Sequence, residues 1–353
     1  MEEFGVDSHK LIYHIPRVYE WLQNGDAFPI CVEITPAERC NQRCIFCAFD
    51  YLEYKGPLID DEILKERLPE MASLGVKAVV YCGEGEPLLH PRFSQLVGYA
   101  KGASLDAALS TNGLNLDLEA AKQYLPLLTW LRVSINAGTP QTYNRIHRGR
   151  STDFDRAMDN LAQMVSLKSQ KKYSCTIGVN FILLDENFDE VLPLARTLKR
   201  IGVDYLAIKP YSWHPSSLNQ LKTSFSFADL AGLDNQLQSI ASQDFSIVLR
   251  FKAMSRAGKP KSYSQCLGLP FFTNINAWGD VMPCQLFMGK REFSYGSIYQ
   301  NSFSEVWRGK QRRSVLERIA RMDISECREN CRIDSINAYL WNLKHPVPHL
   351  NFI

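Results

Sequence analysis

Residues 30–47 read ICVEITPAERCNQRCIFC, a strand-like run followed by a loop with three cysteines. Cys40, Cys44 and Cys47 have the spacing C-x3-C-x2-C, so their thiolates can converge on one metal centre. An odd cluster is a poor pattern for disulfides, and the acidic start of the chain does not resemble a signal peptide. Zinc usually takes four ligands, and no fourth Cys or His lies nearby in the sequence. The loop therefore predicts a metal centre with one open position, such as a four-iron cluster with one iron free to bind a small molecule.

Strand-like runs alternate with helix-length segments from this loop to about Tyr211. The alternation predicts an α/β fold with a parallel sheet and right-handed crossovers. Six units are too few for a closed eight-stranded barrel, so we expect a partial (β/α)6 barrel. Helices are expected at Asp60–Leu74, Asp155–Leu167 and Asn187–Arg200. The expected strands are Ile30–Thr35, Ala78–Cys82, Asp106–Ser110, Leu131–Asn136, Cys175–Leu183 and Tyr205–Lys209.

A second unit begins near Cys266, after the alternation has faded. Gly279-Asp280 supply turn chemistry for a hairpin, and helices are expected at Ser304–Met322 and Ile333–Lys344. The expected divisions are an N-terminal extension (1–29), a barrel (30–230), a linker (231–265) and a small α+β domain with a C-terminal helix (266–353).

The composition narrows the class of protein. The 353 residues are 45% apolar and 22% charged, which is ordinary globular usage and excludes disordered and fibrous classes. A net charge of +2 supports neither general nucleic-acid binding nor a membrane-surface role. No apolar run approaches the roughly 18 residues of a membrane helix. We therefore expect a cytoplasmic protein without nucleic-acid or membrane partners, whose ten cysteines serve more than core packing.

The cysteine loop, with Phe46 before its last cysteine and a strand before its first, resembles that of the radical S-adenosylmethionine (SAM) superfamily. The resemblance implies a [4Fe–4S] cluster ligated by Cys40, Cys44 and Cys47, whose fourth iron chelates SAM. Reductive cleavage of SAM then gives methionine and a 5′-deoxyadenosyl radical that abstracts hydrogen from a substrate. A reductant such as flavodoxin or ferredoxin is implied as a partner. One departure is the segment Pro36-Ala37-Glu38, which lengthens the path from the strand to the first cysteine.

Three further segments fall where this family binds SAM. Gly85-Glu86-Pro87 resembles part of a Gly-Gly-Glu-Pro segment, with Glu84 in place of one glycine, and its carbonyls and carboxylate can accept hydrogen bonds from the methionine ammonium. Ser110–Gly113 and Ser134–Asn136 resemble the segments that reach the ribose and the methionine carboxylate. Apart from the resemblance, these residues could serve only as turns and helix caps. The implied cofactor contacts are Phe46, Gly85, Glu86, Ser110, Asn112, Ser134 and Asn136.

A second cysteine group lies in the C-terminal unit. The pattern Cys266-x12-Gly279-x4-Cys284, followed by Cys327-x3-Cys331, resembles the auxiliary-cluster domains called SPASM and its shortened form, twitch. Only four of the seven cysteines of a full SPASM domain are present, so the resemblance implies one [4Fe–4S] cluster with no iron open to substrate. A four-cysteine zinc site is the alternative for the same residues.

Three cysteines remain, at positions 31, 82 and 175, each in an expected strand, where free cysteine usually acts as a small apolar residue. Cys82 is a weak candidate for catalysis because it precedes the proposed methionine-binding segment. A thiol there could return hydrogen to a substrate radical, as in some radical SAM epimerases. Lys209, Tyr211 and His214 follow the sixth strand and are candidate substrate contacts, since ligands of parallel sheets bind at the carboxyl ends of strands.

The resemblance implies an enzyme that abstracts hydrogen from a small polar substrate, such as a sugar or an aminocyclitol. We expect an oxidation, with the auxiliary cluster as electron acceptor. The alternatives are an epimerase, a peptide-modifying maturase and, from a different class, a non-catalytic zinc protein. Only about 30 residues precede the first strand, so no N-terminal peptide-recognition domain is expected. The sequence does not indicate the identity of the substrate.

Overall fold

A nine-stranded sheet carries the fold, with the strand order β11-β10-β1-β4-β5-β6-β7-β8-β9. The computed structural model describes residues 9–254, 259–346, 348–349 and 351–352. All neighbouring strands run parallel except β10 and β11, which form the expected hairpin. The strands are β1 (Cys31–Ile34), β4 (Ala78–Tyr81), β5 (Asp106–Thr111), β6 (Leu128–Ser134), β7 (Thr176–Leu183), β8 (Tyr205–Pro210), β9 (Ser246–Leu249), β10 (Phe272–Ile275) and β11 (Val281–Met282). The six expected strands and the partial barrel are thus confirmed, and the sheet extends beyond them at both edges.

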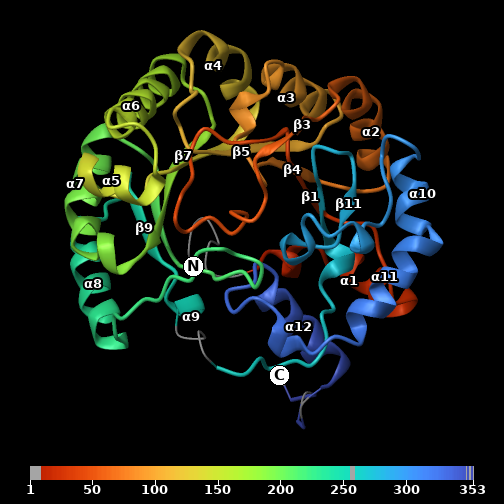
Figure 1. Ribbon diagram of the computed structural model, residues 1–353. Coiled ribbons are helices and arrows are strands. Elements are labelled where there is room, and N and C mark those ends of the chain that lie inside the picture. Colours follow the sequence, from red (N-terminus) through yellow and green to blue (C-terminus); the bar gives the residue numbers. More distant parts are fainter. Residues whose placement is uncertain (1–8, 255–258, 347, 350, 353) are drawn as a thin grey trace.

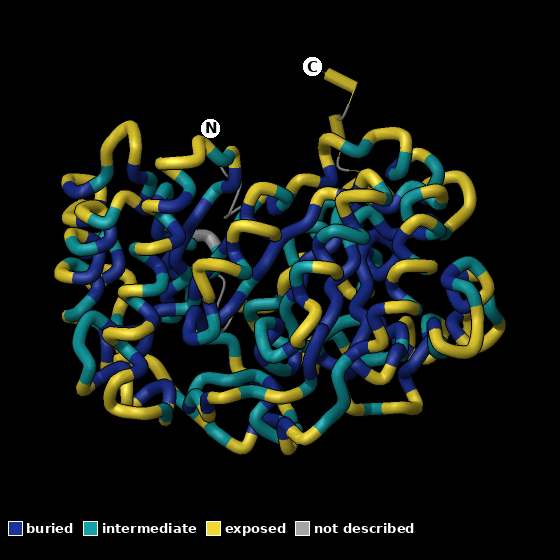
Figure 2. Tube along the Cα trace, turned by 90° about the horizontal axis from the view of Figure 1, so that it is seen from above, coloured by how far each residue is buried: buried dark blue, intermediate teal, exposed yellow. Residues whose placement is uncertain are grey.

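Helices form an arc outside the strands, while the loop over 40–54 lies within it (Figure 1). A second, two-stranded sheet of β2 (Ala37–Arg39) and β3 (Lys55–Leu58) stabilises this loop. Figure 2 shows the buried stretches of chain in the interior, enclosed by exposed ones. The helices are α1 (Ile15–Asn24), α2 (Asp61–Ser73), α3 (Phe93–Gly102), α4 (Leu118–Tyr124), α5 (Pro140–His147), α6 (Asp153–Lys171), α7 (Val191–Ile201), α8 (Phe227–Ile240), α9 (Phe251–Met254), α10 (Phe303–Arg308), α11 (Lys310–Ala320) and α12 (Asp334–Lys344).

The local chemistry of the sequence explains where these helices start and stop. Asp60 caps α2 by accepting the backbone N–H groups of Glu62 and Ile63, as the expected helix start requires. Gly202 ends α7 in the left-handed conformation, with φ of +87°. The expected helix over 304–322 is instead two helices, because Gly309 has an extended conformation between α10 and α11.

The segment expected to be a linker, 231–265, contains most of α8 and all of β9. Strand β9 pairs parallel with β8, so the alternation of strand and helix continues one unit beyond Tyr211. The sequence signal for this unit is weak because β9 has only four residues, Ser246-Ile247-Val248-Leu249. Among the described residues, no helix has the length and apolar character needed to cross a membrane.

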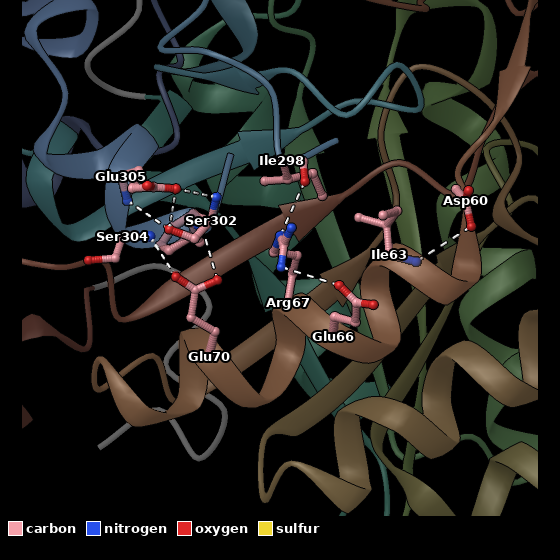
Figure 3. A network of polar contacts seen from close by, with 10 residues as sticks. Asp60, Ile63, Glu66, Arg67, Glu70, Ile298, Ser302, Ser304 and Glu305 are labelled. Carbon is pink, nitrogen blue, oxygen red and sulfur yellow. Dashed lines mark hydrogen bonds and ion pairs between the residues drawn. The ribbon is translucent and has the colours of Figure 1, made fainter. Parts of the chain in front are cut away.

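The C-terminal part packs on the barrel through α2 and α10 (Figure 3). The Glu70 carboxylate on α2 accepts the backbone N–H groups of Phe303 and Ser304, at 2.9 and 2.8 Å, in the first turn of α10. Arg67 Nε donates to the carbonyl of Ile298 at 3.2 Å. Strand β10 also pairs in register with β1, with Val32 opposite Thr273. The C-terminal segment therefore completes the barrel sheet rather than standing apart from it.

Candidate active site

The first cysteine group lies in the loop between β2 and β3, and its three thiols are partly buried. Burial raises the pKa of the Cys40 thiol to about 12, and the charges of Glu86 and Cys47 contribute. Burial also raises the pKa of Cys44, and the nearby Cys47 and Cys40 add to the effect. The thiols of this group thus act on one another's pKa, and a bound metal centre would stabilise all three as thiolates.

Two side chains that the sequence did not single out contact these thiols. The Tyr54 hydroxyl lies 2.8 Å from Cys47 Sγ, and His147 Nδ1 lies 3.3 Å from Cys44 Sγ. His147, at the end of α5, is fully buried and stacks on Tyr143 with 4.0 Å between ring centroids. Phe46 meets the His147 ring edge-on at 5.3 Å. No sequence signal marks Tyr54 or His147, because their contact with the thiols exists only in the folded chain.

The segment after β4 packs directly against the cysteine loop. A Cβ at Gly85 would lie 2.0 Å from the carbonyl oxygen of Ala37 and 2.5 Å from that of Arg39, so only glycine allows this approach. The buried Glu86 carboxylate accepts hydrogen bonds from Thr111 Oγ1 at 2.5 Å and from the backbone of Asn112 at 2.8 Å. Glu86 therefore links the ends of β4 and β5 beside the cysteine loop.

Glu84, which stands where the family has a glycine, has a different environment. Its Oε2 accepts a hydrogen bond from Thr35 at 2.5 Å, whereas its buried Oε1 has no hydrogen-bond partner in the described structure. Burial raises the pKa of Glu84 to about 7. One oxygen of this side chain is thus available to a bound molecule.

The four polar residues expected after β5 and β6 divide into two pairs. Asn112 and Asn136 are buried and make internal hydrogen bonds: Asn112 Nδ2 donates to Asn41 at 2.6 Å, and Asn136 Oδ1 accepts the Ile182 N–H at 2.6 Å. Ser110 and Ser134 are partly exposed, and their hydroxyls have no hydrogen-bond partner in the described part of the chain. The two serines are therefore free to contact a ligand, while the two asparagines fix the surrounding loops.

The second cysteine group gathers in the C-terminal domain. A cavity of about 30 Å³ is lined by Cys284, Cys327 and Cys331, together with Arg328 and Arg332. Burial raises the pKa of Cys266 to about 12, and Cys331 adds to the effect, which places this fourth thiol in the same neighbourhood. A hydrogen bond with Cys331 lowers the pKa of Cys327. The four thiols expected to ligate an auxiliary cluster are thus brought together.

The donor set of the first group fits the cluster that the sequence implies. Cys40, Cys44 and Cys47 offer three thiols, and a [4Fe–4S] cluster binds each thiolate ligand through a different iron, which leaves its fourth iron open. Within the described residues, no group of three or more His, Cys, Asp or Glu side chains is arranged to hold a single metal ion.

Two of the candidate substrate contacts have internal roles. His214 is buried: its Nδ1 accepts the Ser216 N–H at 3.0 Å and its Nε2 lies 3.2 Å from the carbonyl of Gln285. Its ring also stacks on Tyr51, with 5.0 Å between centroids. The Tyr211 hydroxyl has the carbonyl of Asn219 as its acceptor, at 3.5 Å. Lys209, by contrast, has no hydrogen-bond or ion-pair partner among the residues that the structure describes.

Comparison with known families agrees with this geometry. Residues 34–198 match the model of the radical SAM superfamily, and residues 266–332 match the model of the iron–sulfur cluster-binding domain called SPASM. The chain belongs to the radical SAM superfamily and carries a C-terminal domain of the SPASM type. Its cofactors are therefore SAM and a [4Fe–4S] cluster, with auxiliary iron–sulfur chemistry in the C-terminal domain.

Individual relatives differ in what they act on. The tungsten-containing aldehyde ferredoxin oxidoreductase cofactor-modifying protein of Pyrococcus furiosus is 26% identical over 302 residues, which cover 78% of this chain and 79% of that protein. GTP 3′,8-cyclase of Aquifex aeolicus is 31% identical over 181 residues, covering 49% and 53%. The crystal structure of Streptococcus suis SuiB bound to S-adenosylmethionine has a TM-score of 0.66 at 16% identity, covering 85% of this chain and 70% of that one. This last likeness supports the fold alone.

Proposed function

We propose that this radical SAM enzyme abstracts a hydrogen atom from a small polar substrate, such as a sugar or an aminocyclitol, and oxidises it. The supporting observation is the gathering of Cys284, Cys327 and Cys331 around one small cavity, with Cys266 near enough for its charge to add to burial in raising the pKa of Cys284. Four thiolate ligands leave no iron of an auxiliary cluster open to substrate, so electron transfer is the natural role of that cluster. The named relative GTP 3′,8-cyclase also acts on a small polar molecule.

The chain's own residues are assigned as follows. Cys40, Cys44 and Cys47 ligate the first cluster, and the four C-terminal cysteines ligate the second. Ser110 and Ser134, whose hydroxyls have no partner in the described structure, contact SAM, as do Phe46 and the backbone at Gly85. The sequence proposes three further SAM contacts: Glu86, Asn112 and Asn136. They lie at the same strand ends, where internal hydrogen bonds hold them in place.

The proposed oxidation balances as a two-electron process. SAM and the first cluster, when bound and reduced by a flavodoxin or ferredoxin, supply the 5′-deoxyadenosyl radical that takes one hydrogen atom from a C–H bond. Cys266, Cys284, Cys327 and Cys331 would hold the auxiliary cluster, which would accept the second electron of the substrate and pass it to an external acceptor. The substrate would lose a proton to solvent, so an alcohol carbon would become a carbonyl, and one SAM would be consumed per product.

Anaerobic reconstitution tests the radical SAM part of this proposal. The wild-type protein should hold about eight irons and form 5′-deoxyadenosine from SAM under dithionite. Replacing Cys40, Cys44 and Cys47 by Ala should leave about four irons and no SAM cleavage. Zinc without acid-labile sulfide in the wild type, or continued cleavage in the triple variant, would overturn the assignment.

Redox-neutral epimerisation is the second candidate, and the position of Cys82 favours it. Cys82 directly follows β4. Burial raises the pKa of its thiol, whereas the charges of Arg132 and Lys209 lower it. In this reaction the Cys82 thiol gives a hydrogen atom to the substrate radical. One electron from the flavodoxin or ferredoxin and one proton from solvent then restore the thiol. Solvent deuterium bound to carbon in a product of unchanged oxidation level would identify this reaction.

A further inference from the structure

One face of the barrel sheet carries basic side chains from neighbouring strands. Arg132 on β6 lies opposite Gly178 on β7, which lies opposite Tyr205 on β8. A Cβ on Gly178 would lie 2.2 Å from the Tyr205 ring, so this ring crosses over β7 and accepts a hydrogen bond from Arg132 Nε at 2.8 Å. These side chains therefore share one face. Lys209, four residues after Tyr205 on β8, points to the same face, because side chains alternate along a strand.

Lys209 has basic neighbours and no acidic partner. Arg250 follows β9 and lies beside Lys209, since Ile208 pairs with Leu249. Strands β6, β7, β8 and β9 contain no Asp or Glu. The Lys209 ammonium has no hydrogen bond or ion pair with the described residues. Burial lowers the pKa of Lys209 well below its usual range, and the charges of Arg132 and Arg250 lower it further.

Two acids on or after neighbouring barrel strands, Glu33 and Glu84, do not compensate Lys209 either. Glu33 on β1 forms an ion pair with Arg332 and accepts a hydrogen bond from Asn274 at 2.8 Å. Glu84 lies beyond Cys82, and burial raises the pKa of Glu84 to about 7, which removes much of its charge at neutral pH. Lys209 is half-buried in the structure. Taking an ammonium partly out of water without a counter-charge is costly, so its retention favours an anion that the described residues do not supply.

A polar group on the same face also lacks a partner. Asn180 on β7 lies between Ser134 and Ala207 in the sheet register, and its buried Oδ1 has no hydrogen-bond partner in the described structure. Ser134 likewise has no side-chain partner there. Unsatisfied polar groups beside an unpaired cation are typical of a site that awaits a polar ligand.

We infer that this face of the barrel binds an anionic group of the substrate, a carboxylate or a phosphate, through Lys209 with Arg132 beside it. The inference rests on the proposed function, because it deepens the substrate class from small and polar to small, polar and anionic. The terminal nitrogens of Arg132 make no hydrogen bond in the described structure and can donate to the same anion. Asn180 is placed to bind a hydroxyl group of the same molecule.

Saturation-transfer NMR of the reconstituted holoenzyme with SAM tests the inference using three methyl-bearing probes. Methylphosphonate represents the phosphate group, acetate the carboxylate, and acetamide is the neutral counterpart of acetate. At constant ionic strength, at least one anion should bind more tightly than acetamide. Lys209→Met should weaken that binding at least about tenfold, as expected for loss of a charge-assisted hydrogen bond.

Matched variants make the result decisive. Lys209→Arg keeps the charge and should retain the binding of the anion, whereas Lys122→Met, which changes a lysine paired with Glu119 on the protein surface, should have no effect. Anions that bind no better than acetamide, or anion binding unchanged in Lys209→Met, would overturn the inference. Iron content and SAM cleavage of the wild type test the proposed function separately, so the two can fail independently.

Discussion

At the scale of single residues, Glu86 is both a part of the scaffold and a proposed SAM contact. Its carboxylate accepts three internal hydrogen bonds, from Thr111, Asn112 and Leu88, and it is 2% exposed. A charge-assisted hydrogen bond contributes about 1.5–3 kcal/mol, so Glu86→Gln should weaken SAM binding roughly ten- to a hundredfold in calorimetry. The melting temperature should fall as well, because the amide group of Gln presents a donor to neighbouring donors.

Glu84→Gln is the matched control, since Glu84 lies two residues away and has one free oxygen. A lower melting temperature for Glu86→Gln with unchanged SAM affinity would make Glu86 purely structural. If Glu84→Gln alone weakened SAM binding, the ammonium contact would belong to Glu84.

The hydroxyl of Tyr54, 2.8 Å from Cys47 Sγ, should tune the first cluster. A hydrogen bond to a ligand sulfur favours the reduced, more negative cluster. A bond of about 0.5–1.5 kcal/mol corresponds to roughly 20–60 mV for one electron, so Tyr54→Phe should lower the reduction potential by that amount. Potentiometric titration followed by electron paramagnetic resonance measures the shift. Tyr51→Phe is the control, because the Tyr51 hydroxyl donates to the carbonyl of Met288 instead; an equal shift in both variants would contradict the assignment.

The sequence indicated the residues of the site whose spacing is local. The C-x3-C-x2-C loop can be recognised because three ligands fall within one turn-rich segment. Tyr54 and His147 could not be predicted, since their contact with the thiols depends on how β3 and α5 pack on the loop. The inward direction of Lys209 likewise follows from strand pairing, which the sequence does not specify.

At the scale of elements, the contact between α2 and α10 should govern how firmly the C-terminal domain is held. Glu70 places its charge on two N–H groups at the start of α10, where the helix dipole adds to the attraction (Figure 3). Glu70→Gln should lower the free energy needed to detach α10 from α2 by about 1–2 kcal/mol. Hydrogen–deuterium exchange should show faster exchange over 303–308, with little change in the barrel strands.

Glu66→Gln on the same helix is the matched control. Glu66 is 67% exposed and reaches only Arg67, at 3.5 Å, so its removal should leave the exchange rates over 303–308 unchanged. Equal protection of this segment in both variants would show that apolar packing, and not Glu70, holds α10.

Strands and helices with strong local signals were predicted well, and the weak ones were not. The helix over 61–73 has a cap at Asp60 and a glycine stop at Gly75, and both are present in the structure. The break at Gly309 was missed because a single glycine between helical residues is compatible with a continuous helix. Strand β9 was missed because a run of four residues with three apolar side chains does not define a strand by periodicity.

At the scale of the whole molecule, the C-terminal domain is joined to the barrel by strand pairing and by charge. Strand β10 extends the sheet next to β1, about 240 residues away in sequence, and Arg332 beside Cys331 pairs with Glu33 on β1. The sequence could not reveal this arrangement, because register between distant strands has no local signature. The second cysteine group thus lies close to the barrel strand that leads into the first cysteine loop.

This arrangement makes the role of the auxiliary cluster testable. If the cluster takes the second electron of the substrate, replacing Cys327 and Cys331 by Ala should leave SAM cleavage measurable. Product formation should fall sharply, because the substrate radical has lost its oxidant.

Mass spectrometry of a small-molecule cell extract incubated with the enzyme in deuterated water follows the product. If the reaction is redox-neutral instead, Cys82→Ala should stall it, and the wild-type product should contain deuterium bound to carbon. We expect oxidation, which gives a product that is two hydrogens lighter than the substrate and contains no deuterium bound to carbon. The Cys82→Ala variant should still form this product, and the Cys327/Cys331 variant should not.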